Sequence, residues 1–356
     1  MRLLALLAVA ASAATAAAQP SPYHIKQLAP GVHVVVRDVT RGKPSDSNVL
    51  IIINESDVVV VDANIFPESA RQTVREIKKL TNKPVRYVVN THWHSDHHYG
   101  NAIYAQAYPG VEFVGHPYTR HMVLTSDMPD LVKNIEVEYP ADMARIQKAL
   151  DTGKRSNGEP VTPDLRKIFQ ERLEDYRIFI KEMKVTPLIP STLTVADSLV
   201  LERADRSIVI KHLGIGNTAG DLVVYLPKEK VIATGDLVVN PVPFAFNAHL
   251  REWPNTLRTL TTIDAATIVP GHGDVESDWS YVNRLIPLFE ATWDQVSKAV
   301  AGGADLEATR KAVNLDSFRP QFGDNEGDGR LMFDVLFLNP GNESAYNQLK
   351  RDSTKS

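Results

Sequence analysis

The chain has 356 residues, of which 43% are hydrophobic and 23% are charged, as in an ordinary globular protein with a large core. Its formal net charge is -4 and it contains no basic block, which argues against nucleic acid or an anionic membrane surface as a partner. The absence of cysteine excludes disulfides and thiolate ligands, so any metal would be held by His, Asp, Glu or Asn.

The first 18 residues have the pattern of a secretory signal peptide. Arg2 precedes an apolar run from Leu3 to Ala10, and small residues continue to Ala18, where we expect cleavage. The alternative is an uncleaved N-terminal anchor, although the run is short for a membrane span. The sequence therefore predicts an exported protein, periplasmic or secreted, with no membrane attachment once the signal is removed.

Short runs rich in β-branched residues dominate the chain up to residue 116. The run 57–62 is apolar throughout, which predicts a strand buried on both faces. Residues 68–80 form the one helical pattern of this part, with Val74, Ile77 and Leu80 on one face. The remaining predicted strands cover residues 32–36, 48–54, 85–90 and 110–115.

Residues 117–190 change character, because charged residues become dense and apolar residues recur at helical spacing. We interpret this region as a mostly helical insertion, interrupted by a polar loop at 151–160. It could be an ordinary pair of surface helices or a lid over a substrate site.

Strands resume after the insertion, and the chain then becomes helical. The predicted strands cover residues 198–203, 207–212, 221–226, 231–235 and 267–270, and helices are expected at 253–263 and 278–300. Residues 277–356 form a helical C-terminal extension that could pack on the core, build part of a pocket or mediate dimerisation. The sequence leaves the oligomeric state open.

Four histidines and an aspartate are concentrated in Thr91-His92-Trp93-His94-Ser95-Asp96-His97-His98. The stretch follows a predicted strand and precedes a loop signal, so the backbone can turn and direct several imidazoles to one point. Neutral imidazole and carboxylate together suit zinc and similar divalent metals. Three further residues occupy comparable positions at strand ends, namely Asn217, Asp236 and His272.

Together these motifs resemble the metallo-β-lactamase superfamily over residues 30–275. The resemblance rests on H-x-H-x-D-H at 92–97, on Asp62 after an apolar strand, and on T-G-D at Asp236 and P-G-H-G at His272, with a glycine-rich turn before Asn217. It implies an α/β fold, a four-layer αββα sandwich over residues 19–276 that includes the insertion. The metal site would lie along one edge of the two sheets.

The resemblance also implies two metal positions. The first would take His92 and His94 with a third histidine, and the second would take Asp96, His97 and His272.

Asp236 would bridge the two metals, as in the glyoxalase II and lactonase branches of the family. Zinc, at one or two ions per chain, is the expected cofactor, with iron or manganese as alternatives. A metal of this kind lowers the pKa of a bound water, and Asp96 could orient that water toward a carbonyl.

Asn217 departs from the family pattern, because it stands where the third histidine of the first metal belongs. An amide oxygen is a neutral and poorer ligand than imidazole. Asn217 could ligate weakly or through water, another histidine (His98, His116 or His249) could replace it, or the enzyme could work chiefly with the second metal.

Asp62 and His98 are expected beside the ligands. Asp62 would orient the histidine loop, or it would simply cap its strand. His98 is expected behind the ligands or at the surface, because the family motif ends at His97. The aromatic residues of the segment 241–246 could line a substrate pocket or only pack their own loop.

The leading functional hypothesis is an exported metal-dependent hydrolase of a small molecule. Its substrate would be a β-lactam, or a lactone, ester or thioester. An iron-dependent oxygenase or redox enzyme on the same fold is the first alternative. A degenerate metal- or ligand-binding protein, supported only by Asn217, is the second.

Overall fold

The computed structural model describes residues 22–38, 46–156, 158–322 and 332–353. The predicted signal peptide, residues 1–18, lies outside this part of the chain and stays a prediction. Within the described residues, no helix combines the length and the apolar character that a bilayer crossing requires.

Seven strands form the first sheet, in the order β1 to β7 along the chain. The strands β1 to β4 pair antiparallel, whereas β4 to β7 pair parallel. All four residues of β4 are buried, which confirms the prediction of a strand covered on both faces. The bounds are β1 Tyr23–Ala29, β2 Val32–Arg37, β3 Val49–Ile53, β4 Val58–Val61, β5 Val85–Val89, β6 Glu112–Gly115 and β7 Leu193–Thr194.

Five strands form the second sheet, in the order β12-β11-β10-β9-β8. All neighbours are antiparallel except β11 and β12, which run parallel. The carboxyl ends of β11 and β12 therefore meet at one edge of the sheet. The bounds are β8 Ser198–Glu202, β9 Ser207–His212, β10 Leu222–Leu226, β11 Val231–Ala233 and β12 Thr267–Val269.

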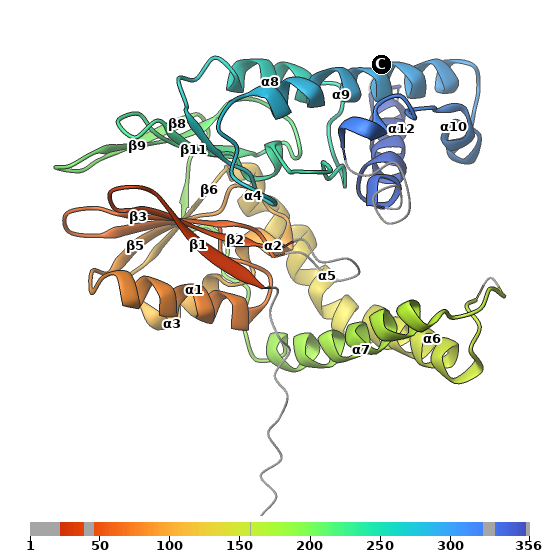
Figure 1. Cartoon of the computed structure of the whole chain (residues 1–356), viewed down its shortest axis with the longest axis horizontal. Coiled ribbons are helices and arrows are strands. Elements are labelled where there is room, and N and C mark those ends of the chain that lie inside the picture. Colours follow the sequence, from red (N-terminus) through yellow and green to blue (C-terminus); the bar gives the residue numbers. More distant parts are fainter. Residues whose placement is uncertain (1–21, 39–45, 157, 323–331, 354–356) are drawn as a thin grey trace, which may run out of the picture.

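The two sheets pack face to face and are covered by helices on their outer faces, which confirms the predicted αββα sandwich (Figure 1). Buried side chains of both sheets form one cluster between them. The helices α1 (Pro67–Leu80) and α3 (Asn101–Ala107) cover the first sheet. Val74 and Ile77 of α1 are buried as predicted, whereas Leu80 lies in the last turn and is 39% exposed.

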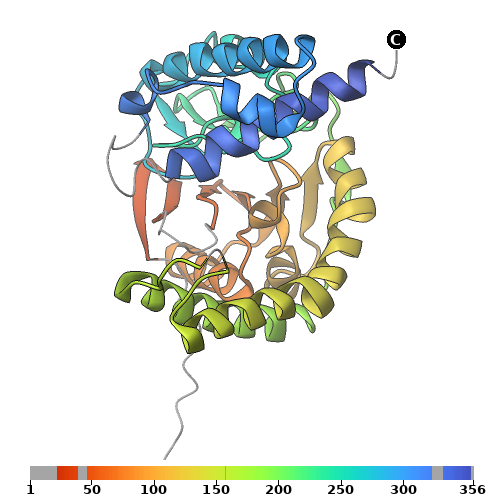
Figure 2. The same cartoon turned by 90° about the vertical axis from the view of Figure 1, so that its right-hand side faces the viewer.

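The predicted insertion contains a continuous helical run. It consists of α4 (Pro117–Met122), η1 (Val123–Asp127), α5 (Met128–Lys133), η2 (Asn134–Glu138) and α6 (Tyr139–Thr152), and η1 and η2 are π-helical turns. Figure 2 shows this run as an arc along one side of the molecule. The helix α7 (Pro163–Met183) then returns antiparallel to α6, and the two form a projecting hairpin (Figure 1).

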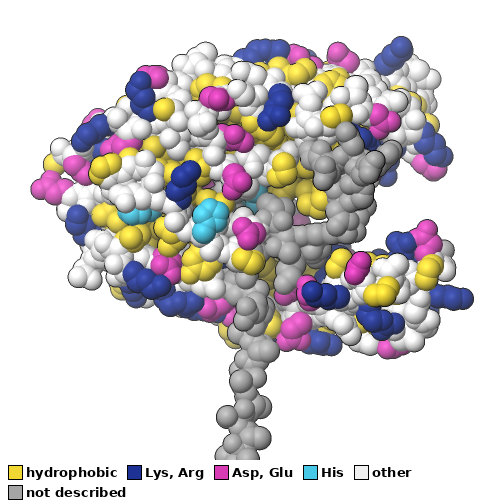
Figure 3. Space-filling model, viewed as in Figure 1, with side chains coloured by type: hydrophobic (Ala, Val, Ile, Leu, Met, Phe, Trp, Pro, Cys, Tyr) yellow, Lys and Arg dark blue, Asp and Glu magenta, His cyan; other side chains and the backbone are white. Residues whose placement is uncertain are grey.

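The C-terminal helices pack on the second sheet. Their buried residues join one apolar cluster with α8 (Trp253–Leu260) and the adjacent sheet. The bounds are α9 Ser280–Ala301, α10 Leu306–Ala312, η4 Arg319–Gln321, η5 Asp334–Leu338 and α12 Asn339–Ser353. Figure 3 shows that the molecule is hollowed between these helices and the α6–α7 hairpin.

Candidate metal centre

The histidine-rich stretch turns directly after β5. The helix α2 (Ser95–His98) is a single turn whose start is fixed by a hydrogen bond from the His97 backbone N–H to the His94 carbonyl, at 3.0 Å. The Asn90 side chain donates to the His97 carbonyl at 2.8 Å. These bonds hold the loop so that several imidazoles point to the same place.

Asp236 and His272 come from the neighbouring carboxyl ends of β11 and β12. Asp236 lies in the short helix η3 (Gly235–Leu237), and His272 follows β12. The Gly271 N–H donates to the Gly235 carbonyl at 3.0 Å and holds the two turns together. A Cβ atom on Gly271 would lie 1.9 Å from Asp236 Oδ1, so this close approach requires glycine.

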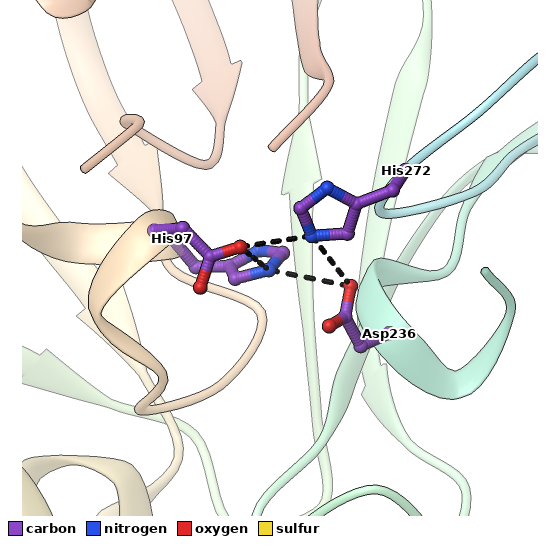
Figure 4. A group of neighbouring side chains, drawn as sticks. His97, Asp236 and His272 are labelled. Carbon is purple, nitrogen blue, oxygen red and sulfur yellow. Dashed lines mark ion pairs between the residues drawn. The ribbon is translucent and has the colours of Figure 1, made fainter. Parts of the chain in front are cut away.

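Asp96, His97, Asp236 and His272 form a compact cluster, which we call the second group (Figure 4). His97 Nε2 lies 3.3 Å from Asp96 Oδ2 and 3.3 Å from Asp236 Oδ1. His272 Nε2 lies 2.8 Å from Asp96 Oδ2 and 3.5 Å from Asp236 Oδ1. Ligands arranged tetrahedrally at zinc–nitrogen distances would be separated by about 3.3 Å. The spacing of the second group therefore fits a shared cation.

His92, His94 and Asp236 form a second cluster, which we call the first group after the predicted first metal. His92 Nε2 lies 3.8 Å from Asp236 Oδ2, and the rings of His92 and His94 are 4.6 Å apart. Asp236 belongs to both groups and directs Oδ2 to the first and Oδ1 to the second. This is the arrangement that the predicted bridging role requires.

Asn217 lies beside the first group and is fully buried. Its Nδ2 is 3.4 Å from His94 Nδ1, and its Oδ1 has no hydrogen-bond partner within the described part of the chain. Rotation of the amide by 180° would exchange Nδ2 and Oδ1 and direct the oxygen toward His94 Nδ1. The turn that carries Asn217 is held by Asp221, which accepts hydrogen bonds from the backbone N–H and the hydroxyl of Thr218.

None of the three histidines considered as replacements for Asn217 joins a ligand group among the described residues. His98 points to Asp127, and His116 caps α4 by accepting from the Tyr118 N–H at 3.1 Å. His249 lines a cavity instead. Asn217 remains the side chain that lies beside His94 where the family pattern has a third histidine.

The donor atoms match a divalent cation chemically. His92 Nε2, His97 Nε2 and Asp236 Oδ1 are buried and make no hydrogen bond within the described residues. Buried polar atoms without partners are rare and costly in proteins. Imidazole nitrogen and carboxylate oxygen are ligands that zinc and related metals prefer. These residues could therefore hold a metal.

The histidines of the two groups have pKa values that shift in opposite directions. Burial lowers the pKa of His92 well below its usual value and also lowers that of His94. Burial acts in the same sense on His97 and His272, but contacts with Asp96 and Asp236 outweigh it and raise the pKa of both imidazoles. The carboxylates thus make the second group attractive to positive charge.

Asp62 contacts the second group from behind. Its Oδ2 accepts from His97 Nδ1 at 2.8 Å, and its Oδ1 accepts from the Thr91 N–H at 2.8 Å. Asp62 has a φ of 65°, a left-handed conformation that is uncommon for aspartate and occurs at functional sites. This geometry leaves His97 Nε2 free to face the cluster, as in metal sites where a carboxylate orients a histidine ligand.

Two adjoining cavities open beside the ligand groups. The inner cavity, of about 400 Å³, is lined by His94, Asp96 and Asp236, together with Phe244 and Phe246 of the segment that follows η3. The aromatic rings of that segment therefore line the cavity, one of the two alternatives for them.

The outer cavity, of about 830 Å³, is lined by residues of the insertion and of α12. Sequence reasoning did not single out Trp93, Ser95, Asp127 or Asn247, which line both cavities. Trp93 and Ser95 stand inside the motif and could have been found from their position in it. Asp127 lies far from it in sequence, and nothing in its neighbourhood indicated a role.

Comparison with known proteins identifies the family. The model of the metallo-β-lactamase superfamily matches residues 42–272. The chain therefore belongs to this superfamily, as its motifs predicted.

Solved structures with the same fold include metallo-β-lactamases. The enzyme from Pontibacter korlensis is 19% identical, with a TM-score of 0.53 over 76% of this chain and 99% of that one. The metallo-β-lactamase IND-7 gives the same identity and TM-score over 76% of this chain and all of its own. FIM-1 from Pseudomonas aeruginosa, solved in a mono-zinc form, is 17% identical, with a TM-score of 0.52 over 76% of this chain and 96% of its own. At these identities the likeness concerns the fold.

Proposed function

We propose that the protein is an exported metal-dependent hydrolase that attacks a carbonyl group of a small molecule. The observation that carries this proposal is the pair of ligand groups joined by Asp236 at the wall of a cavity. Zinc is the proposed metal, because the ligands are imidazoles and carboxylates and because one structural relative was solved with zinc.

A bound zinc ion would supply a Lewis acid and would lower the pKa of a coordinated water toward neutrality. The protein's own contribution is to hold and orient the side chains of the two groups. Asp62 fixes the ring of His97, and the Gly271 turn brings His272 against Asp236. The pKa of Asp96 lies well below its usual value, because contacts with His97 and His272 outweigh the effect of burial. Its carboxylate can therefore accept a hydrogen bond.

We also propose that the two groups hold metal unequally. The second group has two carboxylates and two imidazoles, whereas the first has two imidazoles, a shared carboxylate and the neutral amide of Asn217. The second group would therefore bind the first equivalent of metal.

The substrate is proposed at the level of its reacting group. Export would favour a β-lactam, because β-lactams act outside the inner membrane, whereas Asp236 as a bridging ligand favours a lactone, ester or thioester. The fold is shared with β-lactamases but hosts many chemistries and does not decide between them.

The test measures how fast the zinc-loaded mature protein hydrolyses a chromogenic cephalosporin and a short panel of lactones and esters. Protein from which the metal has been removed with a chelator is the control. Metal-dependent turnover of either class supports the proposal. If no substrate is hydrolysed above the metal-free rate, both substrate proposals fail. Metal analysis of protein purified without added metal tests the iron-dependent alternative, which requires iron in place of zinc.

A further inference from the structure

Asp127 is a carboxylate of the inner cavity that the metal centre does not use. Among the described residues that line this cavity, the charged side chains other than histidine are Asp96, Asp127 and Asp236, with neither lysine nor arginine. Asp96 and Asp236 belong to the ligand groups. Asp127 remains, and it lies where the inner and outer cavities adjoin, because it lines both.

A π-helical turn places Asp127 there. Asp127 is the last residue of η1, and π-helical turns are rare and often occur at functional sites. The other two π-helical turns of the described chain also reach these cavities, through Asn134 of η2 and Leu336 of η5. The local irregularities of two separate helical segments thus coincide with the walls of the two adjoining cavities.

His98 fixes the Asp127 carboxylate. His98 Nε2 lies 2.6 Å from Asp127 Oδ2 and 3.0 Å from the carbonyl oxygen of Trp93. Two oxygen acceptors around one ring nitrogen require that this nitrogen carries the hydrogen. The imidazole therefore holds the carboxylate in place at the cavity wall.

Aromatic rings accompany this carboxylate. Trp93 and Phe246 line both cavities, and Tyr99 and Tyr139 line the outer one. Phe246 is a large apolar side chain, yet 42% of it is exposed beside the cavities. A carboxylate together with aromatic faces is the chemistry that binds ammonium groups, by charge and by cation–π attraction.

We propose that the natural substrate of this enzyme carries an ammonium or similar cationic group beside its reacting carbonyl, and that Asp127 with Trp93 and Phe246 binds this group. The proposal rests on the proposed hydrolase function. It makes Asp127 a specificity-determining residue, whose charge favours a cationic substrate over a neutral one of the same shape.

A matched pair of esters tests this proposal on the zinc-loaded protein. A phenylacetate ester of choline is compared with the phenylacetate ester of 3,3-dimethylbutanol, in which carbon replaces the ammonium nitrogen. We expect kcat/KM for the choline ester to be about 10-fold higher, a factor within the range of cation–π and ion-pair contacts in partly buried sites. The preference should decrease as salt concentration rises.

The variant Asp127→Asn keeps the shape of the side chain and an oxygen for His98 but removes the charge. We expect it to raise KM for the choline ester about 10-fold and to leave the neutral ester nearly unchanged. A merely structural role for Asp127 would lower turnover of both esters alike. Glu136→Gln is the matched control, because Glu136 is an exposed carboxylate on the same helical run that lines neither cavity.

The two proposals fail in different ways. Equal turnover of both esters by the normal protein, or a preference that persists in Asp127→Asn, overturns the cationic specificity and leaves the hydrolase intact. If neither ester is hydrolysed, calorimetry measures the binding of phenyltrimethylammonium and of benzenesulfonate, which tests the recognition site without turnover. Binding of the cation alone that is lost in Asp127→Asn supports the recognition site, and absence of such binding contradicts it.

Discussion

The two ligand groups share Asp236 and lie side by side, yet they differ in charge. In the second group, the imidazoles of His97 and His272 approach carboxylate oxygens at 2.8 to 3.5 Å. In the first group, the closest approach between an imidazole and a carboxylate is the 3.8 Å from His92 to Asp236. Carboxylates therefore govern the pKa of the second-group histidines, whereas burial governs the pKa of His92 and His94.

This difference predicts two metal sites of unequal strength. The second group combines negative charge with a buried carboxylate, Asp62, that orients His97 from behind. The first group has an amide where the family pattern has an imidazole, and it can offer a metal only neutral ligands besides the shared Asp236. We expect a metal to be held firmly at the second group and weakly at the first.

Loss of the shared ligand should have the largest effect. Asp236→Ala removes a carboxylate from both groups and leaves the first group with none. We expect metal content to fall close to zero and kcat/KM to fall by at least about 1,000-fold, which is about 4 kcal/mol of transition-state stabilisation. Metal analysis and steady-state kinetics measure both. Asp264→Ala, at a side chain that is 78% exposed, is the control and should change neither.

The two groups can next be weakened one at a time. His272→Ala should lower turnover by about 100-fold or more, because it removes a ligand of the tightly bound metal. His94→Ala should cost about 10-fold at most. Kinetics at a fixed zinc concentration, with circular dichroism to verify folding, compares the pair. An equal or larger loss in His94→Ala would contradict the assigned order of the two groups.

Proton release should also distinguish the groups. The raised pKa values of His97 and His272 mean that these imidazoles are protonated to a larger extent near neutral pH than an ordinary histidine, and an incoming metal must displace those protons. The lowered pKa values of His92 and His94 mean that they are already deprotonated there. Affinity at the second group should therefore rise more steeply with pH. Calorimetry in buffers of different ionisation enthalpy measures the protons released, and equal release from both steps would argue against the electrostatic difference.

Restoring the missing imidazole should have the smallest effect on turnover and a clear effect on metal content. Asn217→His should raise zinc bound after dialysis from about one to about two ions per chain, because imidazole is a better ligand than an amide. An unchanged stoichiometry and affinity would show that Asn217 does not belong to the first group. Asn255→His, on the exposed side of α8, controls for the added histidine.

Much of the sandwich could be predicted from the sequence, because its strands and covering helices follow the period of their apolar residues. The run 57–62 is apolar and is buried on both faces, as β4. Boundaries were less exact. The strand expected at 231–235 ends at Ala233, because Gly235 turns the chain with a φ of 50°.

The residues of the two groups could be named from their motifs, and the structure brings their side chains together. Asp127 could not be found in this way. It reaches the cavity because a π-helical turn shifts the register of its helix, and such turns have no simple sequence signal. His98, expected behind the ligands or at the surface, is buried and holds that same Asp127.

Unequal metal binding by the two groups, which differ in their carboxylates and in the amide of Asn217, is tested most directly by a calorimetric zinc titration of the metal-free protein. We expect two steps whose affinities differ by about 100-fold or more, with the stronger step lost in His272→Ala and the weaker one in His94→Ala. Two steps of equal affinity in the normal protein would contradict the claim.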